Sequence, residues 1–207
     1  MKTFARREDV RDAILDATDR LLSRYGYRKM TIDDLAREVG IGKGTVYLHF
    51  NSKEEIALSH IDRIVERLKE KLIIISLEDA PPGERLREML ITRVLFRFDS
   101  VQHYTESLNE LLAELRPQLL ARRRHYFDEE AQVFAGVIKT GQDMGAFESG
   151  DPHQIANLLL LATNSLLPYS LSTQELGERP ELGQKVSDLA DLLLSGVRHR
   201  AVANKRK

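Results

Sequence analysis

Apolar residues recur every three or four positions along nearly the whole chain, which is the spacing of one face of an α-helix. The first stripe covers residues 10–22 and is followed by Gly26, which predicts that a helix ends there. A short stripe covers residues 32–39, and a long continuous helix is predicted over residues 54–75. No segment shows a convincing strand pattern, so the sequence predicts an all-α protein.

The second half of the chain continues in helical stripes, over residues 86–98, 104–115, 127–138 and 182–197. Pro117 predicts a stop after the second of these, because proline removes a backbone donor and clashes with the preceding turn. Asp151 and Pro152 together predict a new helix start, with an N-cap followed by proline at the first helical position.

The most informative stretch is MTIDDLAREVGIGKGTVYLHFNSK, residues 30–53. Thr31, with a carboxylate three residues later, resembles a capping box. Gly40 follows Ala36 by four residues, where glycine can adopt the left-handed conformation of a sharp turn. Val46 then falls on the inner face of a second helix. Two short helices joined by such a turn form a helix-turn-helix, whose second helix enters the major groove of DNA.

The outward positions of this stretch carry groups that suit DNA. Lys43 can pair with a phosphate or a guanine edge, and Gly44 allows close approach of the backbone. Ser52 and Glu55 predict a capping box for the next helix, and its N-terminus favours phosphate. The predicted DNA-binding residues are Thr31, Lys43, Gly44, Thr45, Tyr47, His49 and Lys53.

The stretch from Ala13 to Ile56 resembles the DNA-binding domain of the tetracycline-repressor (TetR) family. Gly42 departs from the resemblance, because the family more often has Ser or Thr as the N-cap there. The matching residues are Ile14-Leu15-Asp16-Ala17, Tyr25-Gly26-Tyr27, Thr31, Leu35-Ala36, Val39-Gly40, Lys43-Gly44-Thr45-Val46-Tyr47, His49-Phe50 and Lys53-Glu54-Glu55.

This resemblance implies a three-helix DNA-binding domain over residues 1–53 and a larger helical ligand-binding and dimerisation domain over residues 54–207. It further implies a homodimer that binds double-stranded operator DNA. In such proteins a small molecule enters the helical body, shifts the long helix and releases the DNA. We therefore expect a ligand-responsive repressor; a regulator that senses a protein partner, or nothing, is the alternative.

The composition of the chain argues against several other classes of protein, namely metalloproteins, enzymes and membrane proteins. Cysteine is absent, and the six histidines show no pair at clear metal-ligand spacing, so we expect neither a metal nor a cofactor. The sequence also contains neither the glycine-rich motif of a phosphate-binding loop nor the H-E-x-x-H motif of a zinc protease, so an enzyme is the least favoured hypothesis. The longest apolar stretch is too short to span a bilayer and no signal peptide is recognisable, so a cytoplasmic protein without membrane contact is expected.

Charge is unevenly distributed. Residues 1–53 contain 11 basic and 8 acidic residues, whereas the remainder contains 20 basic and 24 acidic residues. A mildly basic N-terminal part on an acidic body agrees with a polyanionic partner for that part.

Polar groups among the apolar stripes of the body suggest a ligand cavity between the helices of residues 84–170, although for each single residue a surface or core role is the favoured explanation. The candidate ligand-binding residues are Arg97, His103, Tyr104, Asn109, Tyr126 and Asn164.

Residues 155–167 are apolar on nearly all sides, so one side of this helix needs a partner outside the chain's own core. Together with the last helical stripe it predicts a four-helix bundle around a two-fold axis. The predicted interface residues are Leu158, Leu160, Leu161, Val186, Leu189 and Leu193.

Overall fold

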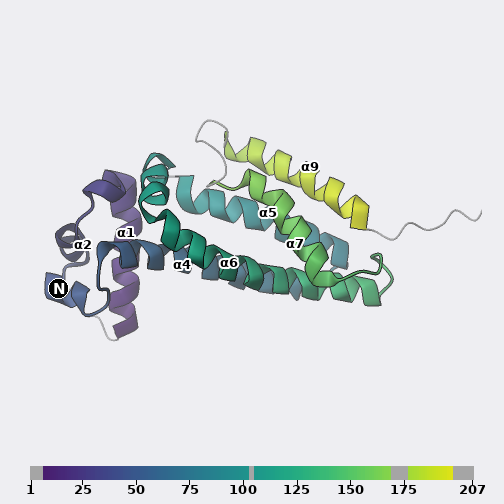
Figure 1. Ribbon diagram of the computed structural model, residues 1–207, viewed down its shortest axis with the longest axis horizontal. Helices are drawn as coiled ribbons and strands as arrows, with labels where there is room; N and C mark the ends of the chain where they lie inside the picture. Colours follow the sequence, from purple (N-terminus) through teal and green to yellow (C-terminus); the bar gives the residue numbers. More distant parts are fainter. Residues whose placement is uncertain (1–6, 103–104, 169–176, 198–207) are drawn as a thin grey trace, which may run out of the picture. The chain divides into compact units, whose positions relative to one another are not determined.

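The computed structural model describes residues 7–102, 105–168 and 177–197, without the side chains of residues 105–109. All regular elements in these ranges are helices, which confirms the predicted all-α class (Figure 1). None of the described helices is long and apolar enough to cross a membrane. The helices are α1 (Arg7–Lys29), α2 (Ile32–Val39), α3 (Lys43–Tyr47), α4 (Lys53–Ser76), α5 (Pro82–Val101), α6 (Thr105–Asp143), α7 (Pro152–Thr163), the 3-10 helix η2 (Asn164–Leu166) and α9 (Arg179–Val197).

The chain divides into two compact units. Unit 1 comprises Met1–Arg67 and Ser100–Arg124, and unit 2 comprises Leu68–Asp99 and His125–Lys207. The helices α4 and α6 therefore contribute residues to both units. This division differs from the boundary predicted at residue 53, because the start of α4 and the first half of α6 belong to the same unit as α1–α3.

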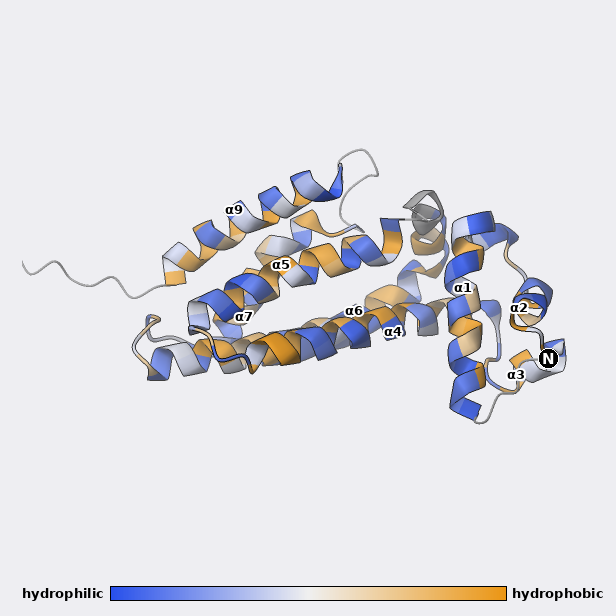
Figure 2. Cartoon of the chain, turned by 180° about the vertical axis from the view of Figure 1, so that it is seen from behind, coloured by the Kyte–Doolittle hydropathy of each residue, from blue (hydrophilic) through white to orange (hydrophobic). Residues whose placement is uncertain are grey.

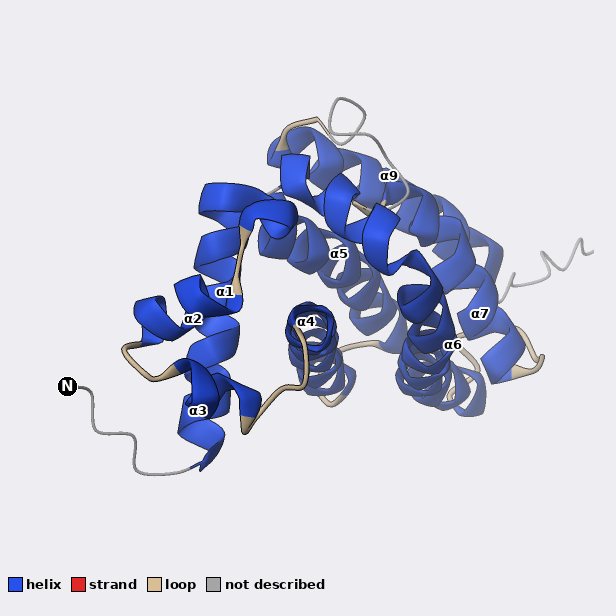
Figure 3. Ribbon diagram, turned by 60° about the vertical axis from the view of Figure 1, so that its left-hand side comes forward, coloured by secondary structure: helices blue, strands red, loops and turns tan. Residues whose placement is uncertain are grey.

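The core of unit 1 joins helices that are distant in sequence. Leu15 and Leu22 of α1 are buried together with Val46, Ile56 and, from α6, Leu111. The predicted break at Gly26 is present: this residue has φ 76° and ψ 169°, and one further turn follows it before Met30. Figure 3 shows α1, α2 and α3 grouped together.

Helix α6 corrects the expectation of a stop at Pro117, because it continues through this residue. Leu111 and Leu115 before the proline are buried in the core of unit 1, and Phe134 and Ile138 beyond it are buried in unit 2. Local propensity is a weak constraint where both flanks of a helix bury apolar side chains, so packing outweighs the loss of one backbone hydrogen bond.

Unit 2 is built from the end of α4, α5, the second half of α6, α7 and α9. Their apolar faces, orange in Figure 2, include Leu72, Met89, Phe134, Leu160 and Ala190 in one core cluster. The predicted start of α7 is confirmed: Asp151 is the N-cap, its carboxylate accepts the backbone N–H of His153 at 2.9 Å, and Pro152 opens the helix.

The residues predicted for a dimer interface separate into three groups by burial. Leu160 and Val186 are fully buried within this chain, so neither is available to a partner, which corrects their assignment. Leu189 and Leu193 are partly buried. Leu158 and Leu161 remain 60% and 62% exposed, and Leu192, which the sequence analysis did not select, is 70% exposed.

Candidate nucleic-acid interface

The turn between α2 and α3 has the predicted geometry. Gly40 caps α2 in the left-handed conformation, with φ 81° and ψ 34°. The backbone N–H groups of Gly40 and Ile41 both donate to the carbonyl of Ala36, at 2.9 and 3.0 Å. Val46 of α3 is fully buried against α1 and α2, so the opposite side of this short helix faces outward. Helices α2 and α3 thus form a helix-turn-helix.

The outward side of α3 carries the Lys43 ammonium, the backbone of Gly44 without a side chain, and the Tyr47 phenol. The Lys43 ammonium donates to the Asp33 carboxylate at 2.7 Å, and this bond raises the pKa of Lys43. Both partners are about half exposed, so the lysine can exchange Asp33 for a phosphate or a base edge. A Cβ added to Gly44 would meet nothing within 4 Å, and Tyr47 is 49% exposed.

Thr31 and Lys53 of the predicted DNA-binding set are engaged within the chain. The Thr31 hydroxyl donates to the Asp34 carboxylate at 2.6 Å and accepts the Asp34 backbone N–H at 3.1 Å, which confirms the capping box. The Lys53 ammonium donates to the carbonyls of Tyr27 and Arg28, at 3.1 and 3.5 Å. Lys53 therefore caps the C-terminal end of α1.

The predicted capping box at the start of α4 is half present. The Ser52 hydroxyl accepts the backbone N–H of Glu55 at 3.1 Å. The Glu55 carboxylate, however, accepts the backbone N–H of Asn51 at 2.7 Å and the Asn51 side chain at 2.8 Å. The Glu55 carboxylate thus binds Asn51, one residue before the Ser52 backbone N–H that the motif predicts.

His49 lies in the segment that directly follows α3, and two arginines of α1 that the sequence analysis missed contact its neighbours Leu48 and Phe50. The Arg7 guanidinium donates to the carbonyl of Leu48 at 3.1 Å, and the Arg11 guanidinium lies 5.1 Å from the centre of the Phe50 ring. Burial lowers the pKa of His49, and the positive charges of Arg7 and Arg11 lower it further. These arginines precede His49 by about forty residues, so no local motif could have indicated them.

The candidate ligand-binding residues are partly brought together in unit 2. Asn164 accepts a hydrogen bond from Arg93 at 2.7 Å, and Arg97 forms an ion pair with Glu130, which also binds Arg93 at 2.7 Å. All of these residues except Arg97 are buried, and Arg97 is nearly so. His103, Tyr104 and the side chain of Asn109 lie outside the described residues, and Tyr126 is half-buried with its ring 6.4 Å from that of His125.

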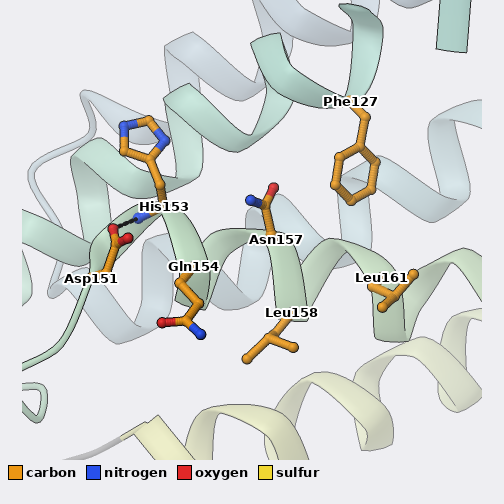
Figure 4. Close-up of a pocket in the computed structure, with 7 residues that line it drawn as sticks. All are labelled: Phe127, Asp151, His153, Gln154, Asn157, Leu158 and Leu161. Atoms are coloured by element: carbon orange, nitrogen blue, oxygen red, sulfur yellow. Dashed lines mark hydrogen bonds between the residues drawn. The ribbon is translucent and has the colours of Figure 1, made fainter. Parts of the chain in front are cut away.

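One open pocket of unit 2, about 690 Å³ with its mouth included, lies between α6 and α7. Figure 4 shows Phe127 from α6 on one side of it and residues at the start and along the exposed face of α7 on the other. Its lining includes none of the candidate ligand-binding residues; it is Phe127, Asp151, His153, Gln154, Asn157, Leu158 and Leu161.

A capped helix-turn-helix followed by a helical body defines a class of DNA-binding regulators. Residues 14–59 match the family model described as bacterial regulatory proteins of the tetR family. Residues 82–185, half of the chain, match a tetracyclin repressor-like C-terminal domain. The chain belongs to the TetR family of transcriptional regulators.

Relatives over most of the length include the fatty acid metabolism regulator protein of Bacillus subtilis, which is 23% identical over 195 residues, 90% of this chain and 95% of the relative. The transcriptional repressor BepR of Brucella suis is 25% identical over 167 residues, 78% of this chain and 79% of the relative. Among solved structures, a complex of SmeT with triclosan has a similar fold, with a TM-score of 0.66, 20% identity and 93% coverage of each chain.

Proposed function

We propose that this protein is a homodimeric repressor that binds operator DNA through α3 and leaves it when a small molecule binds the helical body. The proposed DNA binding is supported mainly by the outward side of α3. Lys43, Gly44 and Tyr47 lie there, and the buried Val46 on the opposite side anchors the helix. As a regulator of chromosomal genes it would act in the cytoplasm, and we assign it no enzymatic role.

The DNA-binding surface is tested with duplexes selected from a random pool by the full-length protein. Lys43→Ala and Tyr47→Ala should each weaken binding to the selected duplex by about 1–3 kcal/mol if a base-edge contact is lost. Both side chains are exposed, so thermal stability should be unchanged and serves as the control. Wild-type affinity in both variants would show that α3 is not the recognition helix.

The two-fold assembly is supported by a family fold together with exposed leucines on two neighbouring helices. Helices α7 and α9 pack against each other, and their outward sides carry Leu158, Leu161 and Leu192. A single helix-turn-helix makes few contacts, and such modules bind as pairs on half-sites spaced by about 34–36 Å, one helical turn.

Repression and its release by a small molecule are supported by relatives, one of them named a repressor and another solved with triclosan. A thermal-shift screen of small molecules, followed by release from the selected duplex, tests this part: an effector must stabilise the protein by mass action and weaken DNA binding. A regulator that senses a protein partner, or nothing, would show neither effect with any compound.

A further inference from the structure

The N-terminal end of α1 carries two arginines that, unlike the other arginines of α1 and α2, have no carboxylate partner among the described residues. Arg20, Arg24, Arg28, Arg37 and Lys43 each lie 2.7–3.9 Å from a carboxylate. Arg7 and Arg11, both exposed, form no ion pair with any described residue. They are held instead by neutral groups, the Leu48 carbonyl and the Phe50 ring.

These neutral contacts attach Arg7 to the residue before His49 and Arg11 to the residue after it, in the segment that directly follows α3. The charged groups that act on His49 both come from α1, and they are Arg7 and Arg11. Three basic side chains therefore lie in or against the segment that follows α3, and in the free protein burial first, and then the charges of the two arginines, lower the pKa of His49. An anion placed among them would offset the charges of the arginines.

The position of this cluster identifies the anion. A recognition helix in the major groove lies between two phosphate backbones, and residues at its ends contact the phosphates and fix its register. Arginine binds phosphate oxygens through a planar fork of donors, and a protonated imidazole adds a further charged donor.

We propose that Arg7, Arg11 and His49 together form a backbone-phosphate site beside α3, and that binding of operator DNA there is coupled to protonation of His49. This inference rests on the proposed role of α3 in DNA binding. Because the DNA-bound state favours protonated His49 and the free state disfavours it, binding takes up a proton. Affinity for DNA therefore rises as the pH falls through the range in which His49 titrates.

The first test measures the salt dependence of binding to a selected duplex and to a random 30-base-pair duplex. Arg7→Gln and Arg11→Gln should each weaken binding to both duplexes alike and reduce the slope of log affinity against log salt by about 0.9. Arg11 packs on Phe50, so Arg11→Lys, which keeps the charge, should retain most of the slope even if Arg11→Gln lowers stability.

Arg24→Gln is the matched control, since it removes the same charge from the same helix, about 20–25 Å further along its axis at 1.5 Å per residue. Its salt slope should equal that of the wild type. Unchanged slopes in both Arg7→Gln and Arg11→Gln, with intact binding by the wild type, would overturn this inference alone. Absence of DNA binding by the wild type would instead overturn the proposed function.

The second test compares wild type and His49→Gln at pH values from 5.5 to 7.5 and constant ionic strength. The wild type should bind the duplex more tightly as the pH falls, whereas His49→Gln should lose this extra dependence and match the wild type near pH 7.5. All other histidines are common to both proteins, so the difference reports on His49. Parallel pH profiles would exclude the coupling.

Discussion

At the scale of single residues, the most unusual feature is the buried ionic cluster of unit 2. Arg93 donates to Glu130, to the Thr163 hydroxyl at 2.9 Å and to Asn164, so its charge is surrounded by acceptors from α6, α7 and η2. Burial alone would raise the pKa of Glu130, but the charges of Arg97 and Arg93 outweigh it and the net shift is downward. Glu130 therefore stays charged in the core and supplies the counter-charge for the two arginines beside it.

Glu130→Gln should therefore be strongly destabilising, because it leaves buried guanidinium groups without their counter-charge. We expect a loss of about 3 kcal/mol in the free energy of unfolding, measured by urea denaturation at neutral pH. Glu129→Gln is the control: its carboxylate pairs with Lys69 at 3.3 Å near the surface and should contribute less than about 1 kcal/mol. Equal effects of the two substitutions would contradict a role for the buried cluster in stability.

Gly141 in α6 is a second residue whose identity depends on a neighbour, because Phe147 occupies the space that a side chain would need. A Cβ at this position would lie 2.1 Å from the Phe147 ring, which is buried after the turn that ends α6. Gly141→Ala should lower the free energy of unfolding by about 1–3 kcal/mol, the usual cost of overpacking.

Gly136, one turn earlier in α6, provides the comparison. An added Cβ there meets nothing within 4 Å. Gly136→Ala should therefore stabilise the protein by about 0.5–1 kcal/mol through helix propensity alone. Chemical denaturation of both variants measures the contrast, and a stabilising Gly141→Ala would show that Phe147 can move aside.

At the scale of elements, Lys53 links α4 to α1. Its ammonium caps the last carbonyls of α1 and lies 4.4 Å from the centre of the Tyr27 ring. We expect Lys53→Ala to reduce the free energy of unfolding by about 1 kcal/mol, from lost helix-end and cation–π contacts, and to leave the salt slope of DNA binding unchanged. The sequence alone assigns Lys53 to DNA binding and predicts a salt slope lower by about one, so parallel denaturation and binding titrations decide between the two.

Elements determined by neighbouring residues could be predicted from the sequence. The cap at Thr31, the left-handed turn at Gly40 and the start of α7 at Asp151 all depend on residues within one turn. The helix end predicted at Pro117 was wrong because distant contacts decide it: apolar side chains on both sides of Pro117 are buried, and α6 continues through it. The sites formed by distant residues could not be predicted: Arg7 and Leu48 are 41 positions apart, and Arg93 and Glu130 are 37 apart.

At the scale of the whole molecule, each chain has one recognition helix, and the proposed dimer would present two of them to DNA. Leu158 and Leu161 of α7 and Leu192 of α9 are 60–70% exposed, and these large apolar side chains on two packed helices are those that the proposed dimer would bury. The buried Leu160 is unsuited to test it, because a charge there would disrupt the core of unit 2 rather than separate two copies.

We therefore expect Leu158→Glu combined with Leu192→Glu to convert the proposed dimer into a folded monomer, because the new carboxylates face water in one chain but would be buried at the proposed interface. Light scattering at micromolar concentration measures the mass, and DNA affinity should fall with it because the paired half-site contact is lost. Leu77→Glu is the control: this leucine is 79% exposed beyond the end of α4 and should leave the dimer intact. A monomeric wild type would refute the dimer, whereas a double variant that remains dimeric would place the interface on another surface of the chain.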